Sequence, residues 1–183
     1  MVLSRRPASR RLLPSWRWLD MAARWLVPFI LLLLGLFILG MPFGIPGQAM
    51  FRPLYAMGCV YFWSLYRPAS LPAPLVALTG LLLDMLGLTP LGVWAVLLLL
   101  LQAATLGLRR YLVPSRFLWV WAGFAVLATA CASLSWLVES AVHHGFVPAF
   151  PILCECLLAI GLYPALAIML IRAHRGPAAL EHT

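Results

Sequence analysis

Long apolar stretches make up most of the chain, and short segments rich in Arg, Pro or Gly separate them. Each stretch is close to or above the length that an α-helix needs to cross about 30 Å of hydrocarbon. The pattern predicts six membrane-spanning helices with short loops, and the third begins at Pro72 or Pro74. They cover approximately residues 25–41, 53–66, 72–86, 90–110, 117–138 and 147–171.

Composition supports a membrane protein, because 64% of the 183 residues are hydrophobic and only 10% are charged. A water-soluble domain has too little interior to bury so many apolar side chains. The predicted organisation is one all-α membrane domain over residues 25–172. A basic cytoplasmic or interfacial segment, residues 1–24, precedes it, and a cytoplasmic tail, residues 173–183, follows it.

The positive charges give the expected orientation. All thirteen basic residues are Arg, and with six spans twelve of them lie on one side of the membrane. Arg52 alone lies on the other side. Arg-rich loops stay in the cytoplasm, so both chain ends are expected there. The net charge of +8 is therefore explained by the membrane orientation of the chain. We expect no nucleic-acid partner, although a soluble protein with this charge would suggest one.

One acidic residue, Asp84, stands inside the apolar run GLLLDMLGLTPLG of residues 80–92. It lies near the outer end of the third predicted span, where a charge is costly. Gly87 is expected to close that helix in a left-handed conformation, Thr89 to cap the next helix and Pro90 to occupy its first position. The resulting tight hairpin brings the backbone N–H groups around Gly92 to the Asp84 carboxylate.

Two alternatives to simple capping stay open for Asp84. The carboxylate either pairs with Arg52, or it belongs to an outward-facing polar pocket formed by Arg52, Asp84 and Glu155. A proton or ion route is disfavoured, because no chain of acidic residues continues through the inner half of the predicted spans.

Each of the remaining candidate features can be explained by structure alone as well as by a function. Glu139, His143 and His144 resemble part of a metal site, but a wet outer loop explains them as well, and we expect no metal and no cofactor. A stripe of small residues in the fifth span favours internal packing over partner docking. The stripe consists of Ala125, Ala128, Ala132 and Ser135. No set of nucleophile, base and acid is evident, so we expect no enzyme activity.

The segment from Arg52 to Ala95 resembles the rod shape-determining protein MreD family. The resemblance depends on FWSLYRP, residues 62–68, and on GLLLDMLGLTPLG, residues 80–92. The residues that match the family pattern are Trp63, Arg67, Pro68, Gly80, Asp84, Pro90, Leu91 and Gly92.

This resemblance implies a multi-pass protein of the bacterial cytoplasmic membrane that belongs to the elongation complex, or elongasome. Such a protein acts as a scaffold in side-wall peptidoglycan biosynthesis and in the regulation of cell shape. The implied partners are MreC and, through it, RodA, a class B penicillin-binding protein (the transpeptidase) and MreB. The family also looks similar in fold to the S-components of energy-coupling-factor (ECF) transporters. The alternative function is therefore a transporter subunit that binds a small molecule, and the residues do not identify a small-molecule or lipid ligand.

Overall fold

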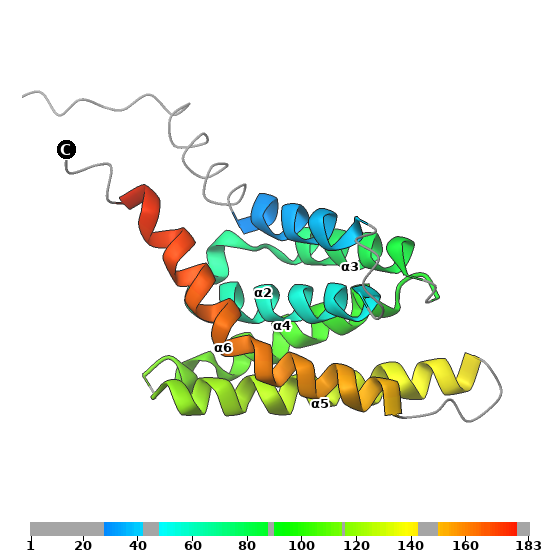
Figure 1. The fold of residues 1–183 in the computed structure, drawn as a ribbon. Coiled ribbons are helices and arrows are strands. Elements are labelled where there is room, and N and C mark those ends of the chain that lie inside the picture. Colours follow the sequence, from blue (N-terminus) through cyan, green and yellow to red (C-terminus); the bar gives the residue numbers. More distant parts are fainter. Residues whose placement is uncertain (1–27, 42–47, 88–89, 115, 143–149, 179–183) are drawn as a thin grey trace, which may run out of the picture.

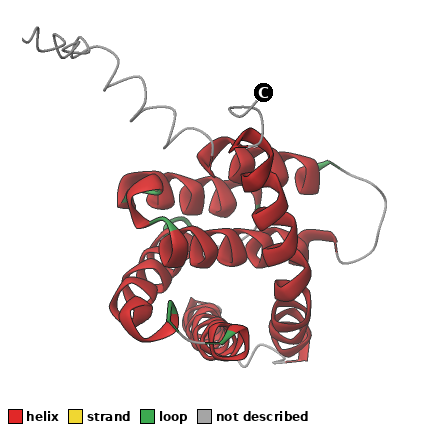
Figure 2. Cartoon of the chain, turned by 90° about the vertical axis from the view of Figure 1, so that its left-hand side faces the viewer, coloured by secondary structure: helices red, strands yellow, loops and turns green. Residues whose placement is uncertain are grey.

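The computed structural model describes residues 28–41, 48–87, 90–114, 116–142 and 150–178. These residues form α-helices and short 3-10 turns, and Figure 2 shows no strand among them. The first described helix is Pro28–Gly40. It is followed by η1 (Gln48–Met50), α2 (Phe51–Tyr66), η2 (Pro68–Ser70), α3 (Ala73–Leu86), α4 (Val93–Leu112), α5 (Phe117–Val142) and α6 (Phe150–Ala178). The expected all-α architecture is confirmed.

Three of the described helices are long and apolar enough to cross a membrane: Val93–Leu112, Phe117–Val142 and Phe150–Arg172. Pro28–Gly40 and Ala73–Leu86 are apolar but shorter. Every predicted span coincides with a helix, and α5 and α6 extend beyond their predicted ends at residues 138 and 171. The sixfold crossing of the membrane and the similarity to S-components stay predictions.

Helix α2 lies at the centre of the bundle, and α4, α6, α3 and α5 all pack against it (Figure 1). Twelve of its sixteen residues are buried, on every side of the helix. A helix that is enclosed by other helices needs an apolar surface all around. The run LYAMGCVYFWSL over residues 54–65 supplies such a surface.

An aromatic cluster joins α2 to α5 and α6. The rings of Phe124 and Tyr163 stack with their centroids 4.3 Å apart, and Tyr61 packs against both. The Tyr61 hydroxyl also donates a hydrogen bond of 2.8 Å to the carbonyl of Val120. Aromatic rings bury a large apolar area and prefer such offset contacts, so this cluster fixes α2 against the α5–α6 pair.

Glycines let two further pairs of helices approach closely. A Cβ atom on Gly80 would lie only 2.3 Å from Cα of Ala95, so the backbones of α3 and α4 are in direct contact there. Gly35 in the first helix similarly leaves room for the ring of Tyr55, whose hydroxyl donates to the carbonyl of Leu31 at 2.8 Å. A side chain at Gly80 would push α3 and α4 apart, and one at Gly35 would displace the ring of Tyr55.

The small-residue stripe of α5 faces partly into the bundle. Ala128 and Ser135 are buried, and Ala125 and Ala132 are half-buried. Helix α5 packs against both α4 and α6. The stripe thus takes part in internal packing, which was the favoured interpretation. The expected interfacial segment, residues 1–24, and residues 179–183 of the expected tail lie outside the described residues, while residues 173–178 continue α6.

Candidate functional site

Asp84 is buried, with 2% of its surface exposed, and its carboxylate receives two hydrogen bonds from the start of α4. The backbone N–H of Gly92 donates to Oδ2 at 2.8 Å, and that of Trp94 donates to Oδ1 at 3.1 Å. The first N–H groups of a helix have no partner within the helix and carry the positive end of its dipole. Asp84 of α3 therefore caps α4, as the tight hairpin predicted.

The turn itself differs from the prediction. Gly87 ends α3 in an extended conformation, with φ −97° and ψ 174°, and the left-handed residue is Gly92, with φ 99°. Pro90 does not occupy the first helical position, because α4 begins only at Val93. Thr89 lies outside the described residues. The left-handed Gly92 aims its own N–H at Asp84, a conformation that residues with a side chain rarely adopt.

Arg52 caps the C-terminal ends of two helices that lie nearby, whereas Asp84 caps an N-terminal end. Its Nε donates to the carbonyl of Leu39 at 3.1 Å, and its Nη1 donates to the carbonyl of Leu86 at 2.8 Å. These carbonyls belong to the last turns of the first helix and of α3, which lack partners within their helices. A guanidinium at two helix C-termini also interacts favourably with both helix dipoles. Arg52 thus joins three helix ends.

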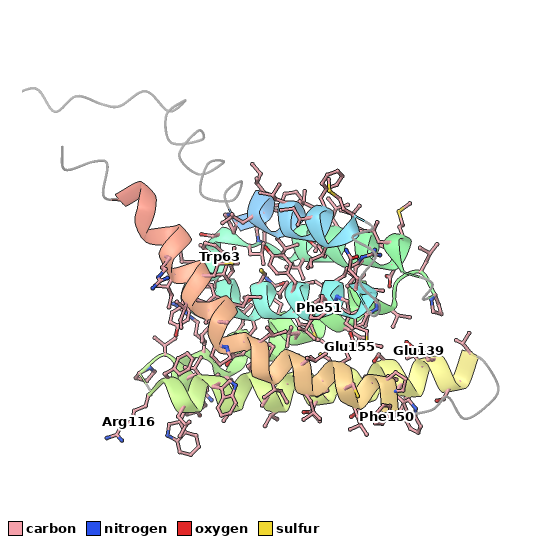
Figure 3. All side chains as sticks on the ribbon, in the orientation of Figure 1. Phe51, Trp63, Arg116, Glu139, Phe150 and Glu155 are labelled. Carbon is pink, nitrogen blue, oxygen red and sulfur yellow. The ribbon has the colours of Figure 1, made fainter. Side chains whose placement is uncertain are left out.

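A cavity of about 220 Å³ opens beside these helix ends, and we call it the polar cavity after the three charged residues in its otherwise apolar lining. Its walls include the side chains of Arg52, Glu139 and Glu155, from α2, α5 and α6. Figure 3 shows both glutamates on the side of α5 and α6 that faces α2. The complete lining is Ala49, Met50, Arg52, Pro53, Leu83, Gly87, Trp94, Glu139 and Glu155.

The cavity brings together two of the three residues of the predicted polar pocket. Asp84 is not among the lining residues, whereas its neighbour Leu83 and its hydrogen-bond donor Trp94 are. Oε1 of Glu155 is buried and has no hydrogen-bond partner among the described residues. The described residues contain no group of three His, Cys, Asp or Glu side chains that would hold a metal ion, and His143 and His144 lie outside them.

The opposite end of the bundle holds three of the residues that match the family pattern. Trp63 is buried, Arg67 is exposed and ends α2 with its backbone N–H donating to the Trp63 carbonyl at 2.8 Å, and Pro68 begins η2. Arg109 of α4 donates from Nε to the carbonyl of Leu65 at 2.8 Å and so caps the C-terminus of α2. Figure 3 shows Trp63 and Arg116 at this end, away from Glu139 and Phe150.

The comparison with protein families decides the identity. The sequence model of the family described as rod shape-determining protein MreD matches residues 20–172. The chain belongs to the MreD family. No curated protein and no solved structure matches it. The MreD match extends well beyond residues 52–95, where the sequence carried the resemblance, and it includes every described helix as far as Arg172.

Some residues at the two ends of this MreD-family bundle were missed by sequence reasoning. Glu139 was considered with two histidines, but it lines a cavity with Arg52 and Glu155. Arg109 was read only as a mark of topology, although it also caps α2. No local sequence signal identifies such contacts, because the partners are 16 to 87 positions apart in the chain.

Proposed function

We propose that this MreD-family chain is a non-enzymatic scaffold of the elongation complex in the bacterial cytoplasmic membrane. The family is one of rod shape-determining proteins, and its match over residues 20–172 is the observation that carries the proposal. The chain binds MreC and, through it, assembles RodA, a class B penicillin-binding protein and MreB. In this role it supports side-wall peptidoglycan synthesis by holding partners together.

The scaffold crosses the membrane six times with both chain ends in the cytoplasm. The distribution of the described Arg residues supports this orientation. Arg67 and Arg116 flank helix ends on one side of the bundle, Arg109 and Arg110 lie in the last turn of α4 on that side, and Arg172 lies toward the end of α6. Arg52 lies at the other side. The Arg-rich end faces the cytoplasm.

Reporter fusions test this orientation. A fluorescent protein fused after Thr183 is expected to fluoresce, and alkaline phosphatase at the same position is expected to be inactive. Alkaline phosphatase inserted between Gly87 and Pro90 is expected to be active. Activity of the phosphatase at the C-terminus would overturn the six-span arrangement.

Co-purification in detergent tests the scaffold role. The wild-type chain is expected to retain MreC, and its failure to do so would contradict the proposal. Tryptophan substitutions then locate the contact. An apolar groove of about 770 Å³ between the first helix and α3 exposes Leu34, Phe37 and Met85. Loss of MreC in Leu34→Trp and Met85→Trp, but not in Leu157→Trp on the exposed face of α6, would place MreC in this groove.

The alternative, a small-molecule-binding transporter subunit, stays a prediction. The polar cavity of about 220 Å³ is smaller than the roughly 300–1,000 Å³ of common ligand pockets. This size gives a vitamin-sized ligand no support at that position. Thermal-shift screening against vitamins and lipid-linked wall precursors tests the alternative, and the absence of any stabilising compound would count against it.

A further inference from the structure

The polar cavity contains charges of both signs. The positive charge has hydrogen-bond partners, whereas the negative charges have none among the described residues. Arg52 donates three hydrogen bonds to backbone carbonyls, through Nε, Nη1 and Nη2. Each terminal nitrogen of a guanidinium carries two hydrogens, so both Nη atoms keep one further N–H for another acceptor. Arg52 is therefore fixed in place by helix ends and still able to bind an anion.

The two glutamates have no such compensation. Glu139 and Glu155 make no hydrogen bond or ion pair with another residue within the described part of the chain. They line the same cavity, where like charges repel each other, and Oε1 of Glu155 has no contact with solvent. Both residues are half-buried, and a carboxylate oxygen that is buried without a partner, such as Oε1 of Glu155, is costly. A cationic hydrogen-bond donor offsets that cost.

The position and the size of the cavity restrict which ligand can supply the cationic hydrogen-bond donor. The cavity lies where the first helix and α3 end and α4 and α6 begin, so lipid headgroups are close by if these helices cross the membrane. Met50, Pro53, Leu83 and Trp94 form its apolar walls. Its volume of about 220 Å³ lies below that of common ligand pockets and suits a small headgroup.

We propose that this cavity binds the phosphoethanolamine headgroup of an aminophospholipid. The primary ammonium donates hydrogen bonds to the carboxylates of Glu139 and Glu155, and the phosphate accepts from the remaining N–H groups of Arg52. A headgroup with both charges thus complements all three charged residues at once. The inference concerns a lipid at the cavity, so it holds or fails independently of MreC binding.

A comparison of two zwitterionic lipids tests the proposal. Phosphatidylcholine carries the same phosphate and the same charge as phosphatidylethanolamine, but its quaternary ammonium donates no hydrogen bond. Wild-type protein is purified from equimolar mixtures of the two lipids, and the bound lipid is quantified by native mass spectrometry. We expect a preference of about tenfold for phosphatidylethanolamine. Equal retention of both lipids would overturn the proposal.

Variants assign the preference to the cavity. The double variant Glu139→Gln, Glu155→Gln is expected to lose the preference, and Arg110→Gln, an exposed change at the other end, is expected to keep it. Persistence of the preference in the double variant would overturn the proposal. If the double variant does not accumulate, Glu155→Gln alone is measured against the same two outcomes.

Competition with soluble glycerophosphoethanolamine shows whether the phosphoethanolamine group must belong to a membrane lipid or also binds as a soluble molecule. If it displaces phosphatidylethanolamine from the wild type, the headgroup alone occupies the cavity, which supports the proposal. If only the complete lipid is retained, and the retention depends on Glu139 and Glu155, the proposal is supported with the bilayer as the source. Displacement by ethanolamine as effective as that by glycerophosphoethanolamine would contradict the role of Arg52.

Discussion

The two ends of the bundle use charge differently. At one end, Asp84 and Arg52 are directed at the backbone, where they cap the start of α4 and the ends of the first helix and α3. At the other end, Arg109 is the one Arg of the described residues that caps a helix in this way, while Arg67, Arg110, Arg116 and Arg172 are exposed. At the first end, Asp84 and Arg52 thus join helices while Glu139 and Glu155 line the cavity, whereas the second end presents most of its charges outward.

This difference shows that the same residue type serves two purposes in one molecule. A charge that satisfies helix-end N–H or C=O groups is fixed by packing, and its removal leaves backbone groups without partners. An exposed Arg next to a membrane contributes to orientation and lipid attraction, and the fold is less sensitive to its loss. The substitutions below test this distinction, in order of decreasing expected effect on stability.

The largest effect is expected at Gly80, close to the end that Asp84 closes. Gly80→Val places a side chain against the backbone of Ala95, where even a Cβ would lie at 2.3 Å from Cα. Separating α3 from α4 is expected to destabilise the protein by at least about 3 kcal/mol. The measurement is the yield and thermal unfolding of protein purified in detergent. Gly107→Ala in α4, which has open space at its Cβ position, serves as the control and is expected to be harmless.

Asp84→Ala is expected to have the next largest effect. The substitution removes the carboxylate that accepts hydrogen bonds from the backbone N–H groups of Gly92 and Trp94. The expected loss of stability is about 2–4 kcal/mol. Asp84→Asn keeps one acceptor oxygen and is expected to lose about half as much. Unfolding curves in detergent compare the three proteins, and equal stability of Asp84→Ala and wild type would show that the cap is unimportant.

The smallest effect is expected at the Arg-rich end. Arg109→Ala removes the hydrogen bond to the carbonyl of Leu65 and is expected to cost about 1–2 kcal/mol. Arg110→Ala is its matched control, because Arg110 is exposed and stacks on the ring of Tyr111 at 4.6 Å. Its expected cost is below about 1 kcal/mol. If both variants lose the same stability by chemical denaturation, the two kinds of Arg are not distinct.

Much of the fold could be predicted from the sequence. Apolar stretches and their Pro, Gly and Arg boundaries located all six described helices, because membrane helices must satisfy their own backbone and are therefore long and continuous. The ends were less accurate. The run from Thr89 to Val93 contains several residues that suit a helix start, and only the left-handed conformation of Gly92 shows that α4 begins after it.

The site was predictable where it depended on neighbours along the chain. Asp84 and Gly92 are eight positions apart across a short turn, so their contact followed from the hairpin. The cavity was only partly predictable, because α2, α5 and α6 contribute Arg52, Glu139 and Glu155 from distant positions. Periodicity shows which face of a helix is buried, but it does not show which helices become neighbours.

Helix length differs across the bundle, with consequences for the surrounding lipid. In the six-span arrangement, the 14 residues of α3 rise about 21 Å, whereas the 26 residues of α5 rise about 39 Å. A bilayer of about 30 Å must become thinner beside the first helix and α3, and α5 must tilt or protrude. The proposed six-span arrangement therefore predicts a gradient of membrane thickness around the molecule, with lipids of shorter acyl chains gathering on its thin side.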